Sequence, residues 1–577
     1  MLWQALASVR DLGRLHDIAS ILVRYGFGDL VRRVGLANAL ERAGRALRWD
    51  HAAEYAHLPP PARVRRAMEE LGPTFVKLGQ VLSTRVDLLE REWVAEFAKL
   101  QDSAPSAPYE AILPQLTEDL GAPPDTVFAQ FDPVPIAAAS IAQVYRARLK
   151  EGGEVVVKVR RPGIVPVVEA DLRWMLRFAQ IAESESPELR AFNPQEVVRR
   201  FRHSLRDEMD FSVECRNAAR IAENFAGWRD AEPGLSDGEA HVLPGVVIPR
   251  IHWPLSSERV CVQERVEGVP GRDLGAADAA GLDRKLLARR GARAVLKMIL
   301  EDGFFHADPH PGNVFYLSGN RVAFIDFGMV GRLTDERRDQ LLEVLLGLVQ
   351  HEPSRVAEVL LEWASGTTVD EEALVAEIEA FVERYRGVPL KQLRLGSMLS
   401  DMVAILRSHH ITLPADTVML VKAFVSLEGM GRELDPEFDM AGEAMPMLER
   451  LVRSRYAPKA IAKRGWIAVR DAVRLIAGLP QDLARLLRAA RRGRLEVHID
   501  VVNLQRVANQ LDRAINRLVL GVVIAALIIG SSIVMTVSGG PTLLGLPFFG
   551  LLGFLGALAG GLWLFFSLWR SNRRDQE

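Results

Sequence analysis

The chain has 577 residues, of which 25% are charged and 49% hydrophobic, and its formal net charge is −2. This composition excludes a mostly disordered protein, and the length exceeds the roughly 300 residues that one hydrophobic core organises, so we expect several folded units. Only two cysteines are present, Cys215 and Cys261, which excludes a disulfide framework, gives no plausible zinc site and favours a reducing, intracellular setting.

The first 120 residues predict α-helices, because apolar residues recur three and four positions apart. Prolines interrupt this pattern at Pro59-Pro60-Pro61 and again at Pro105 and Pro108. The N-terminus lacks both a long apolar run and a small-residue cleavage site, so it does not resemble a secretory signal. We therefore expect an N-terminal helical region in a protein whose bulk is not exported.

The pattern then changes to strands. Residues 131–160 alternate in a β-branched pattern, with Val155-Val156-Val157-Lys158-Val159 after the turn Glu151-Gly152-Gly153, which predicts a β-hairpin. Beyond it we expect helix over 166–225, strands around 247–266, and mainly helices from 281 onward, with a short strand pair near 314 and 324. A small β-rich unit followed by a larger helical unit indicates an α+β class.

Two apolar stretches near the C-terminus, residues 518–537 and 546–569, contain no charged residue. Each has about the 20 residues that an α-helix needs to cross a bilayer. The turn-forming sequence Ser538-Gly539-Gly540-Pro541 separates them, and arginines flank both outer ends, which favours a cytoplasmic location for those ends. We expect a transmembrane helical hairpin; a buried hairpin of a soluble protein is the alternative.

A basic region precedes the first apolar stretch. From Arg450 to Arg517 there are 16 Lys or Arg residues against five Asp or Glu. This region could be a solvated helix face, or it could contact anionic lipid headgroups, which attract each basic residue near the surface by about 1 kcal/mol.

The strongest chemical signal is His306-Ala307-Asp308-Pro309-His310-Pro311-Gly312-Asn313, followed by Asp326-Phe327-Gly328 after a strand-like stretch. An Asp five positions before an Asn is common by chance, but its combination with Asp-Phe-Gly at this distance is rare and typical of phosphoryl-transfer sites. Asp326 and Asn313 would hold Mg²⁺, which prefers oxygen ligands, and Asp308 would orient or deprotonate the attacking hydroxyl or water. Taken singly, each residue could instead cap a helix or occupy a turn.

Lys158 ends an apolar strand-like run, where its ammonium could reach phosphates, and Glu214 in the helical stretch 208–214 is a candidate ion-pair partner. Exposed lysines are also common in strands, and spatial proximity is not encoded in the spacing. His310 could be proposed as a metal ligand, but a histidine between two prolines is more typical of a loop residue.

A kinase would carry a glycine-rich loop before that lysine. Here the corresponding stretch, residues 135–144, is rich in alanine. Alanine disfavours the positive φ angles that glycine permits, so we expect this loop to follow a different and stiffer path near the phosphates.

With these motifs the chain resembles the UbiB family of protein-kinase-like proteins, also called the AarF or ABC1 group. The alanine-rich loop looks like that family's substitute for the glycine-rich loop. Residues 71–80 look like its Lys-x-Gly-Gln motif, Glu208-Met209-Asp210 matches its Glu-x-Asp motif, and Glu214 with Asn217 continues that pattern. The resemblance covers roughly residues 60–335. It implies a bilobal protein-kinase-like fold with an N-terminal helical extension that lies over the place where a protein substrate would dock.

The resemblance also implies a site for ATP and Mg²⁺. The catalytic residues would be Asp308, Lys158 and Glu214, and the metal ligands would be Asn313 and Asp326. The residues expected at the nucleotide are Ala137, Ala138, Ala139, Ser140, Ile141, Val144, Lys158, Glu264 and Val266. The regulatory motif would comprise Lys77, Gly79, Gln80, Glu208 and Asp210, with Lys77 and Gln80 pointing toward the nucleotide cleft. Without the family, Lys77 and Gln80 would be read as the polar face of an amphipathic helix.

Three departures narrow this interpretation. Ala307 stands where a kinase catalytic loop usually has an Arg that pairs with a phosphorylated activation loop. After Asp326-Phe327-Gly328 a helical pattern begins at Asp335, without an Ala-Pro-Glu sequence or room for a long activation segment, so a protein substrate is disfavoured. Tyr145 stands where the family often has His, which leaves the nucleotide site unaffected.

Family resemblance implies an atypical kinase or ATPase that supports synthesis of ubiquinone or another isoprenoid quinone at a bacterial inner membrane, with its kinase-like domain in the cytoplasm. The alternative is a non-catalytic, nucleotide-gated scaffold or lipid-handling protein for quinone-synthesis enzymes. A kinase of the antibiotic-phosphotransferase type is a third interpretation, but it does not explain the membrane hairpin. Expected partners are membrane lipids and a quinone precursor or quinone-synthesis enzymes; no nucleic acid is expected, and a homodimer is compatible with the sequence.

The expected domain boundaries follow from these patterns. They are an N-terminal helical extension (1–120), a kinase-like N-lobe (121–270), a kinase-like C-lobe (271–455), a basic juxtamembrane region (456–517), and two transmembrane helices with a cytoplasmic tail (518–577).

Overall fold

The computed structural model describes most of the chain up to residue 455 and short pieces beyond it. The described residues are 9–33, 55, 57–85, 89–100, 106–185, 193–228, 245–350, 352–363, 370–385, 394–409, 411, 413–455, 523, 525–533, 542–543, 546–547, 552 and 555–557. The chain divides into two units, Met1–Ala460 and Ile461–Glu577.

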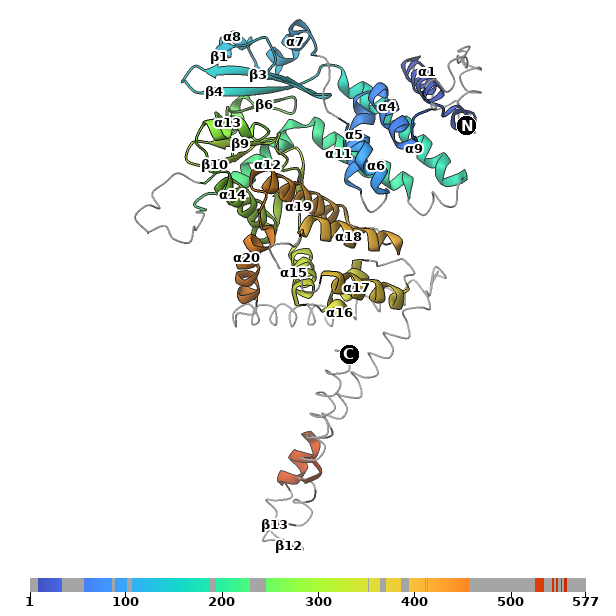
Figure 1. Cartoon of the computed structure of the whole chain (residues 1–577), viewed down its shortest axis with the longest axis vertical. Helices are drawn as coiled ribbons and strands as arrows, with labels where there is room; N and C mark the ends of the chain where they lie inside the picture. The colour runs from blue at the N-terminus through green and yellow to red at the C-terminus, as the bar shows by residue number, and fades with distance from the viewer. Residues whose placement is uncertain are drawn as a thin grey trace. The chain divides into compact units, whose positions relative to one another are not determined.

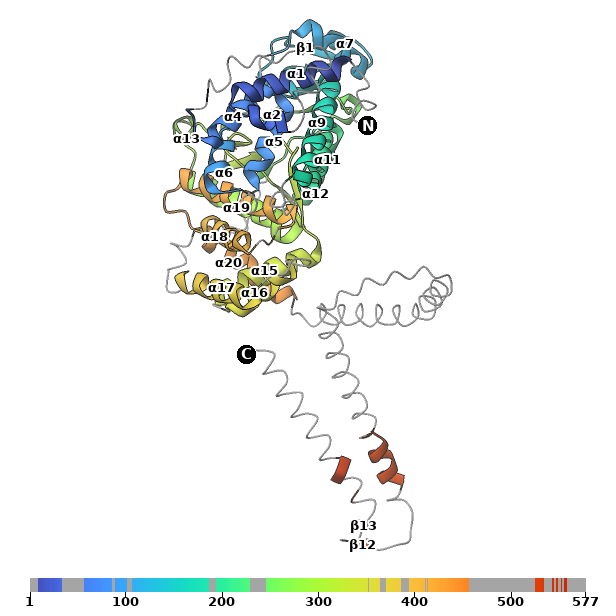
Figure 2. The same ribbon diagram turned by 90° about the vertical axis from the view of Figure 1, so that its right-hand side faces the viewer.

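Helices from two separate stretches of the chain pack together as an N-terminal helical bundle (Figures 1 and 2). They are α1 (Val9–Arg24), α2 (Gly28–Arg33), α4 (Pro60–Leu71), α5 (Pro73–Thr84), α6 (Arg91–Phe97), α9 (Ile164–Glu185) and α11 (Pro194–Met209). Their apolar faces share a core that includes Met68, Phe75, Leu172 and Phe201. Burial of these faces holds together helices that are distant in sequence.

An antiparallel sheet forms the N-lobe, with strand order β1-β3-β4-β6 and β2 beside β3. The strands are β1 (Phe128–Phe131), β2 (Ala137–Ala138), β3 (Ala142–Leu149), β4 (Glu154–Arg160) and β6 (Val260–Glu264). The β3–β4 hairpin turns through Gly152 and Gly153, whose φ angles of 86° and 103° favour glycine. Tyr145 and Val157 are fully buried on the sheet face that α7 (Tyr109–Leu120) covers, and α8 (Pro124–Val127) precedes β1.

Asp210 separates α11 from α12 (Phe211–Asn224), because its side chain accepts a 3.0 Å hydrogen bond from the backbone N of Ser212 and caps the second helix.

The C-lobe contains a sheet of order β5-β10-β9-β7 and a β8–β11 pair. These strands are β5 (Val246–Val247), β7 (Val269–Pro270), β8 (Phe304–His306), β9 (Val314–Leu317), β10 (Arg321–Phe324) and β11 (Val330–Arg332).

Helices surround these C-lobe strands and share one large apolar core with them. They are α13 (Leu274–Ala279), α14 (Arg284–Lys297), the π-helix η2 (Met298–Asp302), α15 (Asp335–Gln350), α16 (Pro353–Trp363), α17 (Glu371–Tyr385), α18 (Leu395–Ser408), α19 (Ala415–Leu434) and α20 (Met440–Arg455). The 3₁₀ helix η1 (Trp253–Leu255) packs against β6 of the N-lobe sheet instead. Helix α19 packs against α14, α18, α5 and β11. It therefore contacts both the C-lobe and the N-terminal helical bundle.

The structure confirms the α+β class, the β3–β4 hairpin, the strand pair near 314 and 324, and the helix that begins at Asp335. The prediction of one continuous helical stretch through residues 208–214 is wrong, because Asp210 ends one helix and caps the next. The short strands β7, β8 and β11 were not predicted. Each has only two or three residues, too few for a periodic signal.

Most of the predicted transmembrane hairpin, including the turn 538–541, lies outside the described residues, as does the basic region 456–517. Residues 525–533 of the first segment are helical. The second segment is not helical at its first two residues, since β13 (Leu546–Pro547) pairs with β12 (Thr542–Leu543), and proline is unsuited to a helix interior. Among the described residues, no helix combines the length and apolar character needed to span a membrane.

Gly331 provides a test of packing in the C-lobe. It pairs with Phe305 across β11 and β8, and a Cβ at Gly331 would lie 2.1 Å from the buried Phe305 ring. Gly331→Ala should therefore destabilise the C-lobe by about 1–3 kcal/mol, the usual cost of overpacking. Thermal unfolding of the full chain should show a lower Tm.

The matched control for this change is Gly429→Ala in α19, where no atom beyond the neighbouring helix backbone lies within 4 Å of the added Cβ. Alanine is favoured over glycine in a helix by about 1 kcal/mol, so the control should keep or raise Tm. Equal Tm for Gly331→Ala and the wild type would contradict the tight contact with Phe305.

Candidate functional site

Strand β4 and helix α12 bring Lys158 and Glu214 together. The Lys158 Nζ donates a 2.7 Å hydrogen bond to Glu214 Oε2, and the same Nζ lies 5.3 Å from the centroid of the Phe211 ring. The Glu214 side chain is only 7% exposed. A buried carboxylate in this position holds the lysine side chain in one orientation.

Asp326 lies next to this pair. Its Oδ1 is 3.8 Å from Lys158 Nζ, and about half of its side chain is exposed. Its backbone has φ 59°, a left-handed conformation that Asp tolerates better than most residues, and Oδ1 accepts a 3.3 Å hydrogen bond from Gly328 N. The Asn217 amide donates a 3.0 Å hydrogen bond to Phe327 O, which ties α12 to the segment that presents Asp326.

The charges of these three side chains are coupled. The Lys158 ammonium holds the pKa of Asp326 below its usual range, and the Lys77 ammonium acts in the same direction with a smaller effect. Burial lowers the pKa of Lys158, but the carboxylates of Asp326 and Glu214 outweigh burial and raise it. Burial raises the pKa of Glu214 against the opposing attraction of Lys158. The site therefore keeps a charged lysine beside an ionised Asp326.

The loop of residues 307–313, which follows β8, is held by hydrogen bonds to backbone atoms. Asn313 Nδ2 donates a 3.2 Å hydrogen bond to Asp308 O, and Ile325 N donates a 2.9 Å hydrogen bond to Asn313 O. Ala307 N donates to Met329 O over 3.1 Å. The loop is therefore joined to the segment on both sides of Asp326.

His306 fixes this loop from the interior. The ring is fully buried, its Nδ1 accepts a 3.1 Å hydrogen bond from Asp308 N, and its Nε2 lies 3.2 Å from Ile325 O. These partners assign the proton to Nε2 of a neutral imidazole. Burial lowers the pKa of His306, despite the nearby carboxylates of Asp308 and Asp326. The motif was predicted from its Asp and Asn, and this role of its histidine was not.

This lowered pKa predicts a pH-dependent stability. The folded pKa of His306 lies below the unfolded value, so its contribution to stability is fully present above about pH 6.5 and is lost as the pH falls through the folded pKa, with a slope of up to about 1.4 kcal/mol per pH unit. His306→Asn keeps a side-chain acceptor but cannot bind a proton. It should reduce the loss of Tm between pH 7.5 and 5.5.

The control for this change is His203, whose side chain is 82% exposed. His203→Asn should leave the pH dependence of Tm as in the wild type. The interpretation of His306 as a buried neutral histidine would be wrong if His306→Asn and the wild type lost the same stability over this interval.

The Asp308 carboxylate has a partner that sequence reasoning missed. Lys422 of α19 places its Nζ 3.0 Å from Asp308 Oδ1, and His310 Nε2 lies 3.7 Å from Asp308 Oδ2. Lys422 is the only charged residue between Thr417 and Leu427. The sequence does show a single lysine in an apolar helical stretch. Its partner Asp308 lies 114 positions earlier, however, and no sequence pattern indicates that the two residues meet.

The alanine-rich loop continues into the sheet edge. Ala137 and Ala138 of β2 pair with Val144 and Gln143 of β3, and Ala139 N donates a 2.8 Å hydrogen bond to Ala142 O. This pairing makes a closed turn in place of an open glycine loop. Ala137 is exposed, and Ala138, Ala139 and Val144 are half-buried.

Two other residues of this loop point to the interior. Ser140 is buried, and Ile141 is 3% exposed in the core of the N-terminal helical bundle. Glu264 and Val266 lie at and just beyond the end of β6, where Glu264 is exposed and pairs with Val155, whereas Lys158 pairs with Cys261. Glu264 and Val266 therefore lie farther along the sheet than Lys158. Among the described interactions, neither residue contacts Lys158 directly.

The Lys-x-Gly-Gln helix α5 faces the Glu-x-Asp segment. Lys77 forms an ion pair with Glu208, and Gln80 Nε2 donates a 3.2 Å hydrogen bond to Leu100 O. A Cβ at Gly79 would lie 2.2 Å from Leu100 Cδ1, so this glycine permits close packing. Asp210 caps α12. Lys77 therefore lies near the site, whereas Gln80 contacts backbone of its own helical bundle.

The oxygen donors fit the Mg²⁺ that the motifs imply. Asp326 is half-exposed and ionised, and the Asn313 amide nitrogen is engaged by Asp308 O, which leaves the amide oxygen as the group suited to a cation. In the described part of the chain, no three His, Cys, Asp or Glu side chains converge as a metal cluster. A Mg²⁺ carried with phosphates needs only one or two protein ligands.

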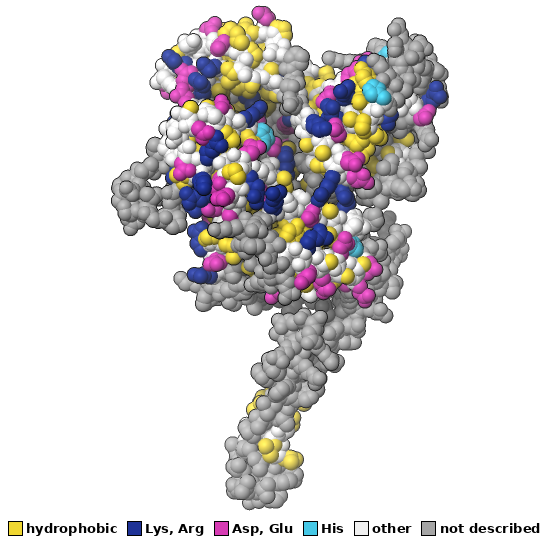
Figure 3. Space-filling view, in the orientation of Figure 1, with side chains coloured by type: hydrophobic (Ala, Val, Ile, Leu, Met, Phe, Trp, Pro, Cys, Tyr) yellow, Lys and Arg dark blue, Asp and Glu magenta, His cyan; other side chains and the backbone are white. Residues whose placement is uncertain are grey.

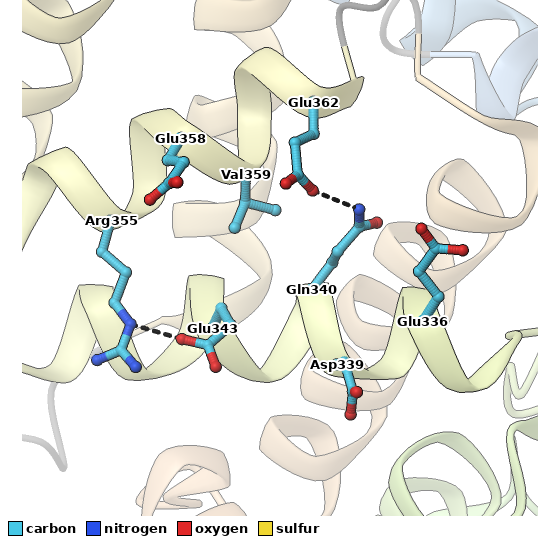
Figure 4. A pocket seen from close by; sticks show the side chains of 8 residues that line it. All are labelled: Glu336, Asp339, Gln340, Glu343, Arg355, Glu358, Val359 and Glu362. Carbon is cyan, nitrogen blue, oxygen red and sulfur yellow. Dashed lines mark hydrogen bonds and ion pairs between the residues drawn. The ribbon is translucent and has the colours of Figure 1, made fainter. Parts of the chain in front are cut away.

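A groove of about 580 Å³ lies elsewhere, between α15 and α16 (Figure 4). It is lined mainly by acidic side chains, and Arg355 and Gln340 hydrogen-bond to Glu343 and Glu362 across it, at 2.5 and 2.7 Å. It contains none of the predicted site residues. The groove is therefore separate from the residues that the sequence associates with phosphoryl transfer.

Models of known families match three parts of the chain. The ABC1 atypical kinase-like domain matches residues 99–360, the UbiB helical domain matches residues 378–439, and the ABC1/UbiB kinase-like C-terminal domain matches residues 502–570. These matches cover the site residues from Lys158 to Asp326 and also Lys422.

The chain is also similar to whole proteins. Two similar proteins are named "Probable protein kinase UbiB". The one from Pseudomonas paraeruginosa (strain DSM 24068 / PA7) is 36% identical, and the match covers 78% of this chain and 83% of the relative. The one from Azotobacter vinelandii (strain DJ / ATCC BAA-1303) is 37% identical, and the match covers 78% of this chain and 82% of the relative. A solved complex of Rv3197 with erythromycin from Mycobacterium tuberculosis is 21% identical and covers 63% of this chain and 92% of that one, with a TM-score of 0.39 that is too low to support a structural argument. The similarity to the two relatives extends over most of both proteins, and with the ordered site it shows that this chain belongs to the ABC1/UbiB family of atypical kinase-like proteins.

Proposed function

We propose that this protein is an ATP- and Mg²⁺-dependent ATPase or small-molecule phosphotransferase. The observation that carries the proposal is the arrangement of Lys158 between Glu214, at 2.7 Å, and Asp326, at 3.8 Å. Phosphoryl transfer depends on positioning and charge neutralisation more than on covalent help from the protein. A fixed ammonium next to an ionised carboxylate supplies both.

Each residue would have a distinct role. Lys158 would bind phosphate oxygens, and Asp326 with Asn313 would hold Mg²⁺, which when bound neutralises charge on the phosphates. Asp308 would orient the attacking hydroxyl or water and accept its proton. His306 holds the backbone of Asp308 and does not itself reach the reacting atoms, because both ring nitrogens already have backbone partners.

The segment after Asp326 supports water or a small molecule as the acceptor. Strand β11 ends at Arg332 and α15 begins at Asp335. This connection leaves no room for the long activation segment on which protein substrates dock in protein kinases. A protein acceptor would need a different binding surface.

We further propose that residues 518–537 and 546–569 anchor the protein in a membrane with its kinase-like unit in the cytoplasm. In the described part of this region, apolar side chains are exposed in the isolated chain, including Val523, Leu527, Ile528, Ile529, Ile533, Leu552 and Leu555 (Figure 3). Exposed aliphatic side chains in such density are unfavourable in water and favourable in lipid. A membrane-bound, lipid-like quinone precursor would then be a suitable substrate or effector, as the family resemblance implies.

A non-catalytic nucleotide-gated scaffold is the second candidate. The observation that favours it is the ion pair of Lys77 with Glu208 beside the site, together with the β2–β3 pairing that closes the alanine-rich loop. Such contacts could restrict access of an acceptor while nucleotide still binds.

Phosphate release by the purified full chain tests the choice. We expect Mg²⁺-dependent release of phosphate from ATP that rises when anionic liposomes and a phenolic quinone-head analogue are added. Release that is unchanged by liposomes would contradict the membrane part alone. ATP binding without any release under all these conditions would reject the enzyme in favour of the scaffold.

A further inference from the structure

Helix α19 brings a cation from outside the kinase motifs to the catalytic carboxylate. Lys422 Nζ lies 3.0 Å from Asp308 Oδ1 and 3.9 Å from Met329 Sδ. The lysine and aspartate side chains are each 25% exposed. A charged pair this close and only partly hydrated holds the carboxylate more firmly than a surface pair does.

The position of Lys422 is fixed by the packing of its helix. Its neighbours Val421, Ala423 and Phe424 are buried in the C-lobe core. Farther along α19, Glu428 Oε2 accepts a 2.7 Å hydrogen bond from Gly396 N at the start of α18. The helix also packs against β11, which follows the Asp326 segment. A displacement of α19 would therefore move the ammonium relative to Asp308.

The loop that carries Asp308, residues 306–313, contains no lysine. The two carboxylate oxygens face different groups, Lys422 on the Oδ1 side and the half-exposed His310 on the Oδ2 side. Only the Lys422 contact is within hydrogen-bond distance. The orientation of the Asp308 carboxyl group thus depends mainly on Lys422, which lies 109 positions after the loop residue Asn313.

We propose that Lys422 is a positioning residue for phosphoryl transfer: it holds the Asp308 carboxylate in the orientation that accepts the acceptor's proton, and it makes α19 part of the active site. This inference rests on the proposed phosphotransferase or ATPase function. A carboxylate free to rotate would spend less time facing the acceptor, and small misplacements of catalytic groups can cost about a hundredfold in rate. Nucleotide binding through Lys158 and Asp326 does not use Lys422.

The test compares the wild-type full chain with Lys422→Met, Lys422→Arg and the charge-matched control Lys285→Met. Lys285 is an exposed residue at the start of α14. Lys422→Met should lower kcat for phosphate release by about ten- to a hundredfold while KM for ATP stays within about threefold, because the loss is in positioning and not in ATP binding. Lys422→Arg should restore part of kcat, and Lys285→Met should match the wild type.

A double-mutant cycle with Asp308→Asn separates positioning from folding. If Lys422 acts through Asp308, Lys422→Met should cost little further activity in the Asp308→Asn background, whereas a purely structural loss would reduce activity equally in both backgrounds. Additive losses, or a kcat of Lys422→Met within about threefold of the wild type, would overturn the inference alone. A wild type without phosphate release would overturn the proposed function and this inference with it.

Discussion

Asp326→Asn is expected to abolish the Mg²⁺-dependent part of ATP binding. Asp326 is the half-exposed carboxylate beside Lys158, and the two ammonium groups of Lys158 and Lys77 keep it ionised. Asparagine preserves its size and tolerates the left-handed backbone at φ 59°, so the change removes charge without forcing the loop to move. Replacing groups that merely support a metal ligand costs about 10–100-fold in metal affinity, and loss of the ligand itself should cost at least that much.

Titration of ATP in the presence of Mg²⁺ and then of EDTA measures this effect. The wild type should bind ATP much more tightly with Mg²⁺, and Asp326→Asn should show nearly equal affinities in both conditions. Lys158 and Glu214 remain in the variant, so weak metal-independent binding should persist. Asp335→Asn, which changes a 92% exposed side chain on α15, is the control and should behave as wild type. A full Mg²⁺ effect in Asp326→Asn would remove Asp326 from the metal site.

Local patterns predicted the parts of the site that lie within a few residues of a turn or strand. The Gly152-Gly153 turn and the alternating residues on either side predicted the hairpin that carries Lys158, because glycine and period-two burial have direct structural causes. The Asp-Phe-Gly sequence after a strand likewise predicted where Asp326 would lie. These features are encoded by neighbours along the chain.

Contacts between distant segments could be proposed but not located. The pairing of Lys158 with Glu214 was a candidate that only the packing of α12 against β6 brings within 2.7 Å. Lys422 was not proposed at all, because α19 reaches Asp308 through the packing of the whole C-lobe. Asp210 was assigned to a motif, yet its observed contact is a helix cap whose local preference was present in the sequence.

Ile141 has a packing role that the family pattern did not predict. The alanine-rich loop was assigned to the nucleotide as a unit, but the structure buries Ile141 in the apolar core of the N-terminal helical bundle. One side of the loop thus anchors the N-terminal helical bundle, and the other side, with Ala137 exposed, is available to a ligand.

Asp308→Asn is expected to slow phosphate release by orders of magnitude while ATP stays bound. Asparagine keeps a side-chain oxygen but cannot take the acceptor's proton at neutral pH. General-base catalysis contributes about 10²–10⁴-fold, so kcat should fall by that factor. The nucleotide contacts through Lys158 and Asp326 are unchanged, so the Kd for MgATP should stay within about threefold of the wild type.

This combination separates the enzyme from the scaffold more sharply than activity alone. Phosphate release and ATP binding are measured on the same preparations of wild type, Asp308→Asn and Asp335→Asn, with liposomes and a phenolic quinone-head analogue present. Release that survives Asp308→Asn at the wild-type rate would mean that Asp308 is not the base, because no other carboxylate of the Asp-x4-Asn loop could replace it. Loss of release together with loss of ATP binding would instead assign Asp308 to nucleotide binding. Only a variant that binds ATP normally but no longer releases phosphate at the wild-type rate supports proton transfer to Asp308. That result would also support the role proposed for Lys422, whose Nζ contacts the same carboxylate.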